Sequence, residues 1–192
     1  KLRTAKTETL VLKDKKTDAE ISVLSKQITQ GQVNADTLSL EELMYSASLT
    51  PSLEEKATIY EAATKKAQNW QAHNNLGAVY IAQAVENPDN AESLAGKAQA
   101  QLDIAARLNE SAPGIHANLA SVSMMQGNAR AAYNHANEAL QAGLSGDNAA
   151  GLNGVKGAAE ISLARYQDAV RSLSSASEEA VNRYSVAMSG DL

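Results

Sequence analysis

The stretch AHNNLGAVY at residues 72–80 returns in altered form as IHANLASVS at residues 115–123. In both copies a His is followed, two residues later, by Asn, then Leu and then a small residue. A third, weaker copy, NGVKGAAE, begins at Asn153, with Gly157 at the small position. Recurrence at intervals of a few tens of residues indicates that one supersecondary unit is stacked several times. The chain is therefore expected to have a repeat architecture.

Each copy leads into a second segment whose small or apolar residues recur at intervals of four and three, which places them on one face of a helix. The three sets are Ala98, Leu102 and Ala105; Ala132, Ala136 and Ala139; and Ala169, Leu173 and Ala176. Each repeat is thus predicted to be a pair of closely packed helices. The composition agrees, because 44% of residues are hydrophobic but only 4% are aromatic, with no Phe and no Cys. A large sandwich or barrel core would need more Val, Ile and aromatic residues.

Residues 37–192 are predicted to form these helical repeats. Upstream of the first copy, residues 38–67 predict another helical hairpin with its turn at Pro51. The last segment, 177–192, predicts a first repeat helix and a turn at Gly190, without the second helix. We expect a parent protein that continues past this truncated repeat. The start at Lys1 rather than Met also suggests a piece of a longer protein.

Residues 1–36 are predicted to form a separate N-terminal arm. A short strand is expected around Leu10–Leu12, followed by a helix with Asp18 as its N-cap and apolar residues at helical spacing. One strand is not stable alone, so the arm either packs on the repeats or ends a preceding domain. We favour the preceding domain.

The repeats resemble the tetratricopeptide repeat, a pair of antiparallel helices of about 34 residues. Leu76, Gly77 and Tyr80 match the first helix of that family, and Gly127 matches its turn glycine. The resemblance implies an all-α, tetratricopeptide-like solenoid of antiparallel helical hairpins with a short extended N-terminal arm.

Several residues depart from the family pattern. Ala129 replaces the aromatic residue of the turn, and Ala164 replaces the turn glycine of the next unit. The repeat spacing is 43 and then 37 residues, measured from His73 to His116 and then to Asn153. The first spacing is longer than the family repeat of about 34 residues, and we assign the extra residues to a loop at residues 85–93, which contains a Pro and two Asn.

No catalytic constellation, cofactor motif or metal-ligand set stands out, so we predict no enzyme activity, no cofactor and no metal. His73 and His116 invite a metal interpretation but lack Cys or a paired carboxylate nearby, and we interpret them as repeat-packing residues. The net charge of −5 argues against a general nucleic-acid binder. No apolar run approaches the roughly 20 residues that span a bilayer, so no membrane insertion by this segment is expected.

The family resemblance implies that the first helices line a concave groove for a protein or peptide. Carried over position by position, the groove residues are Asn74, Asn75, Ile81, Asn118, Ser121 and Met125. Asn75 and Asn118 fall where many family members hydrogen-bond a peptide main chain, which an amide suits because it donates and accepts. Alternatively, these Asn side chains cap or bridge neighbouring helices.

The function that this implies is a non-catalytic interaction scaffold; the alternative is a spacer or self-assembly element between flanking domains. Residues 41–50, 54–63 and 74–80 are similar to the repeat segment of Gram-negative envelope proteins that carry an OmpA-like domain. That similarity implies a periplasmic or outer-membrane-associated location, with a cytoplasmic one as the alternative. Peptidoglycan contact would come only through domains outside this chain.

Overall fold

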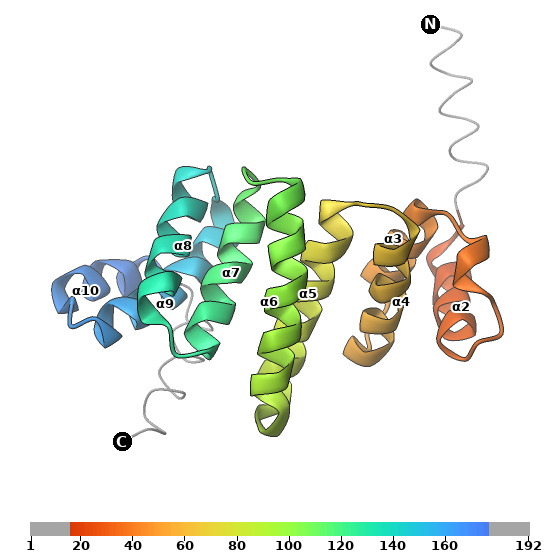
Figure 1. Cartoon of the computed structure of the whole chain (residues 1–192), viewed down its shortest axis with the longest axis horizontal. Coiled ribbons are helices and arrows are strands. Elements are labelled where there is room, and N and C mark those ends of the chain that lie inside the picture. Colours follow the sequence, from red (N-terminus) through yellow and green to blue (C-terminus); the bar gives the residue numbers. More distant parts are fainter. Residues whose placement is uncertain (1–15, 177–192) are drawn as a thin grey trace, which may run out of the picture. The chain divides into compact units, whose positions relative to one another are not determined.

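A computed structural model describes residues 16–176, and all regular structure within that range is helical (Figure 1). The predicted all-α fold class is confirmed for this part of the chain. The predicted strand around Leu10–Leu12 and the predicted helix within 177–192 lie outside the described residues. The chain divides into two compact units between Ala67 and Gln68.

From residue 16 onward, the first unit contains three α-helices and one short 3-10 helix. These are α2 (Asp18–Thr29), η1 (Ala35–Thr37), α3 (Leu40–Leu49) and α4 (Leu53–Lys66). Helix α2 packs against both α3 and α4, which form the hairpin predicted around Pro51. The helix that we placed in an arm ending at residue 36 therefore packs with this hairpin, and the boundary between units lies further along the chain.

Polar side chains fix where the helices of the first unit begin. Helix α3 has a capping box, in which Ser39 accepts a hydrogen bond from the Glu42 backbone N–H and the Glu42 carboxylate accepts one from the Ser39 backbone. Helix α2 is capped by Thr17, whose hydroxyl oxygen accepts from the Glu20 N–H at 3.2 Å. The predicted cap, Asp18, is instead the first helical residue, where its negative charge suits the helix dipole.

Buried hydroxyl groups join α2 to α3 inside the first unit. The Ser25 and Ser46 hydroxyl oxygens lie 2.7 Å apart, and Thr50 donates to Ser25 at 2.9 Å. All three side chains are almost fully buried. Because each hydroxyl has a partner, this polar contact avoids the cost of an unsatisfied buried group.

Up to residue 176, the second unit consists of three successive helix pairs (Figure 1). Its elements are α5 (Trp70–Glu86), η2 (Pro88–Asn90), α6 (Ala91–Leu108), α7 (Pro113–Met125), α8 (Ala129–Gln141), α9 (Gly146–Ser162) and α10 (Tyr166–Ser174). Helix α5 packs on α6, α7 on α8 and α9 on α10. The first helices also touch one another, α5 with α7 and α7 with α9. The predicted pairing of helices is thus confirmed within the described residues.

The first helix pair is longer than the second, and this accounts for the wide repeat spacing. Pro88 does break the chain, because α5 ends at Glu86 and a 3-10 turn follows. However, α6 already begins at Ala91, so the predicted loop at 85–93 is wrong in extent. Helices α5 and α6 have 17 and 18 residues, whereas α7 and α8 have 13 each. Most of the extra residues therefore lengthen helices.

Each helix pair crosses where a small residue meets its partner helix. A Cβ atom on Gly77 would lie 2.8 Å from Leu102 Cγ, and one on Gly157 would lie 2.7 Å from Leu173 Cγ, both closer than real Cβ contacts. The α5–α6 and α9–α10 pairs therefore each cross at a contact between Gly and Leu.

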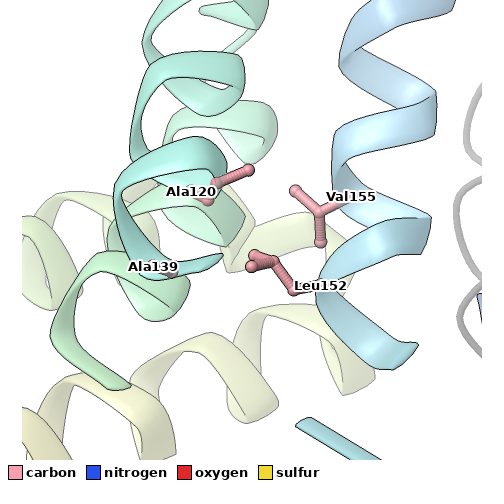
Figure 2. Packing of buried hydrophobic residues seen from close by; sticks show 5 residues of the cluster. Ala120, Ala139, Leu152 and Val155 are labelled. Carbon is pink, nitrogen blue, oxygen red and sulfur yellow. The ribbon is translucent and has the colours of Figure 1, made fainter. Parts of the chain in front are cut away.

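The middle pair, α7–α8, has two alanines at the positions of this Gly–Leu contact. Ala120 and Ala136 occupy the corresponding positions, and both are fully buried. In Figure 2, Leu152 and Val155 of α9 point toward Ala120 of α7 and complete the cluster. In each of the three pairs, a smaller side chain on the first helix is thus matched by a larger one on the second, or both are of intermediate size, as close packing requires.

The turns after α7 and α9 have the same backbone conformation but different residues. Gly127 has φ 75° and Ala164 has φ 60°, both in the left-handed region. In each turn an N–H reaches back to close the helix end, from Asn128 to the Ser123 carbonyl and from Arg165 to the Glu160 carbonyl. Ala164 therefore adopts a conformation that glycine adopts without strain.

Replacing Ala164 by Gly is expected to raise the free energy of unfolding by about 1 kcal/mol, because it relieves the left-handed strain. Ala164 is exposed, so little packing is lost. Urea unfolding followed by circular dichroism measures the change. Gly127→Ala is the matched control and should lower stability by a similar amount. A destabilised Ala164→Gly protein would contradict the strain argument.

Candidate functional site

The six predicted groove residues lie on two helices that touch each other. Asn74, Asn75 and Ile81 belong to α5, and Asn118, Ser121 and Met125 belong to α7. All six side chains are partly exposed. We call these six residues the α5–α7 surface, which has both amide and apolar side chains within reach of a ligand.

The two asparagines singled out by the repeat pattern differ in their surroundings. Asn118 Nδ2 donates a hydrogen bond to Asn74 Oδ1 at 2.9 Å, which bridges α7 to α5. This contact is the helix-bridging alternative that the sequence left open for Asn118. Asn75 makes no side-chain hydrogen bond within residues 16–176, so its amide can meet a ligand. Of the two, Asn75 is the better candidate for binding.

The two patterned histidines also have different partners. His73 is 8% exposed, and its Nδ1 lies 2.7 Å from Gln101 Oε1 on α6, so it helps to pack its own helix pair. His116, at the corresponding repeat position on α7, meets His135 and Glu138 of α8. The sequence repeat did not reveal this group. It compares the first helices of successive pairs with one another, and it does not show which residues of the two helices within one pair are in contact.

His116, His135 and Glu138 form what we call the His116 cluster. His116 Nδ1 lies 2.9 Å from Glu138 Oε2, and His135 Nδ1 lies 3.8 Å from the same oxygen. The two rings stack with centroids 6.2 Å apart and planes inclined by 24°. One sequence signal could have revealed the group, since His135 and Glu138 are three residues apart on a predicted helix and so share a face.

The cluster is half enclosed by the protein. The side chains of His116 and His135 are 13% and 29% exposed, whereas Glu138 is 48% exposed. Burial lowers the pKa of His135, and the nearby His116 adds to this effect, although the charges of Glu138 and Asp103 oppose it. Burial therefore favours the neutral imidazole of His135, which has one nitrogen lone pair.

A buried carboxyl group ties together the last helix pair. Glu160 of α9 is 2% exposed and accepts a hydrogen bond from the Ser172 hydroxyl of α10. Ser172 holds the repeat position of Gln101, but its partner Glu160 lies two helical turns after Asn153, the residue that corresponds to His73. The corresponding second-helix residues Gln101, His135 and Ser172 thus have different polar partners in the three helix pairs.

Comparisons of the chain with family models, with curated proteins and with solved structures found no match. The tetratricopeptide and OmpA-related resemblances therefore rest on the residue pattern alone. Among the helices of residues 16–176, none combines the length and apolar character needed to cross a membrane.

Proposed function

We propose that this chain is a non-catalytic scaffold of tetratricopeptide-like hairpins that binds a polypeptide partner along the α5–α7 surface. One observation carries the proposal: contact between α5 and α7 places all six predicted groove residues on adjoining helices with partly exposed side chains. In a tetratricopeptide-like solenoid these first helices would line the concave face, where an extended peptide would lie.

The chemistry of this surface suits an extended main chain. The Asn75 amide can donate to a peptide carbonyl and accept from a peptide N–H. Ile81 and Met125 supply apolar area for side chains, and the flexible Met adapts to different shapes. The Asn74–Asn118 hydrogen bond holds these two amides in place between α5 and α7. Such a surface would recognise backbone first and side chains second.

We further propose that the parent is a cell-envelope protein, on the basis of the similarity to repeat segments that accompany OmpA-like domains. Peptidoglycan would then be bound by domains outside this chain, while the helix pairs organise a protein partner. A spacer or self-assembly role is the second candidate. It is favoured by the Asn74–Asn118 contact, which uses two of the predicted binding amides to join helices.

Asn75→Ala is expected to leave the free energy of unfolding within about 0.5 kcal/mol of wild type, because no hydrogen bond is lost. Asn118→Ala should cost about 1 kcal/mol, since it breaks a partly buried amide contact. Chemical denaturation measures both values. Crosslinking pull-down of the full-length parent from its native cell then identifies partners that depend on Asn75.

Asn134→Ala is the matched control, because it removes an exposed amide from α8, outside the α5–α7 surface. The scaffold proposal requires a partner that is lost with Asn75→Ala and retained with Asn134→Ala. An unchanged set of partners in both variants would move the function to flanking domains and leave the helix pairs as a spacer.

A further inference from the structure

The hydrogen bond of His116 to the backbone shows which ring nitrogen carries a hydrogen. His116 Nε2 lies 2.7 Å from the carbonyl oxygen of Glu110. A carbonyl can only accept, so Nε2 carries the hydrogen and, in the neutral ring, Nδ1 carries the lone pair. Metal-bound histidines are oriented in the same way, by donating from the second ring nitrogen to a carbonyl or carboxylate.

The other ring nitrogen, Nδ1 of His116, faces the two other side chains of the cluster. Nδ1 of His116 and Nδ1 of His135 are both buried, and neither has a hydrogen-bond partner among residues 16–176. The Glu138 oxygen at 2.9 Å is within ion-pair distance of His116 Nδ1 but is not placed as a hydrogen-bond acceptor for it. An unprotonated nitrogen and a carboxylate oxygen at this distance repel each other unless a proton or a metal cation lies between them.

The neighbouring helix pairs show that packing alone does not require this arrangement. At the three corresponding positions, the other two pairs carry residues that cannot supply three ligands. These are His73, Gln101 and Ile104 in α5–α6, and Asn153, Ser172 and Ser175 following the same alignment in the last pair. The α5–α6 pair satisfies its single His with an amide at 2.7 Å. The His–His–Glu combination is thus particular to α7–α8.

We propose that the His116 cluster binds a divalent transition-metal ion, with Zn²⁺ as the best fit, through His116 Nδ1, His135 Nδ1 and the Glu138 carboxylate. The three donor atoms all lie within 4.8 Å of one another. In tetrahedral zinc sites donor atoms lie ~3.4 Å apart, since each is about 2.1 Å from the metal. The observed separations of 2.9 and 3.8 Å from Glu138 lie on either side of that value.

Donor chemistry selects the ion. Two imidazole nitrogens and one carboxylate suit Zn²⁺ and its transition-metal neighbours, whereas Ca²⁺ and Mg²⁺ prefer oxygen ligands. Three protein ligands leave the fourth tetrahedral position to water. Glu138 is the most exposed of the three residues, so the ion enters and leaves from its side.

Titration calorimetry with Zn²⁺ on the chelator-treated full chain tests this site. We expect one Zn²⁺ per chain, a Zn²⁺-dependent rise in melting temperature, and no competition from Mg²⁺ or Ca²⁺. His135→Gln and Glu138→Gln should each weaken Zn²⁺ binding by at least about 100-fold, because loss of outer-shell partners alone costs up to that much. His135→Gln reproduces the residue that α5–α6 carries at Gln101, so folding is expected to persist.

Glu92→Gln is the charge-matched control, because it removes one exposed carboxylate from α6, outside the cluster. Its Zn²⁺ affinity should stay within about 2-fold of wild type, as expected for a weakly interacting surface charge. Absence of saturable Zn²⁺ binding would reduce the cluster to an ion pair and overturn the proposal. Equal affinities of Glu138→Gln and Glu92→Gln would also overturn it, and this comparison stands even if His135→Gln unfolds.

Discussion

Replacing Gly77 by Leu should lower the free energy of unfolding of the second unit by about 3 kcal/mol. Even a single added carbon would lie 2.8 Å from Leu102 Cγ and 3.5 Å from the Ala98 carbonyl oxygen. Leu102 is fully buried, so its side chain has no room to retreat. The helices α5 and α6 would have to separate along their contact. Chemical denaturation followed by circular dichroism measures this loss.

A double-mutant cycle shows whether the loss comes from this one contact. Gly77→Ala combined with Leu102→Ala recreates the Ala120–Ala136 pair found in the middle of the unit. We expect the double variant to be more stable than the sum of the single changes by at least about 1 kcal/mol. Gly96→Ala is the control on α6, where an added carbon meets nothing within 4 Å and should stabilise the helix. Additive single changes would contradict the size-exchange argument.

The same Gly and Leu positions explain why the helix pairs were predictable from sequence. A crossing that needs one small and one larger residue leaves a pattern that repeats with each pair, as in Gly77 with Leu102 and Gly157 with Leu173. The pattern marks contacts within a pair, because both members are fixed by a single crossing. It does not mark helix length, and so the extra residues near Pro88 were assigned to a loop instead of to longer helices.

The His116 cluster was not predictable from the same repeat pattern. Its three residues occupy repeat positions that the other pairs fill with different residues, so no recurring pattern marks them. What brings them together is the packing of α7 against α8, which turns His135 and Glu138 toward His116. The role of Asn118 was not predictable from sequence either, because the pattern does not distinguish an amide that binds a ligand from one that bridges two helices, as Asn118 does.

Replacing Ile59 by Ala should lower the free energy of unfolding of the first unit by about 2–5 kcal/mol, because Ile59 is fully buried in α4 and little can fill the space it leaves. Hydrogen exchange should become faster throughout α3 and α4, and also in α2, since α2 packs on both. The exchange of α2 is the informative part, because it tests whether this helix is stabilised by the hairpin or by a preceding domain.

Two control variants make that test quantitative. Ile59→Val leaves a smaller gap and should cost about 1 kcal/mol, with a proportionately smaller rise in α2 exchange. Thr58→Ala changes the exposed neighbour on α4 and should stay within about 0.5 kcal/mol of wild type. If Ile59→Ala loosened α3 and α4 while α2 kept its protection, α2 would draw its stability from elsewhere, as the separate-arm hypothesis requires. Joint loss of protection would establish that α2 folds together with the hairpin, since a helix of 12 residues is marginal without packing.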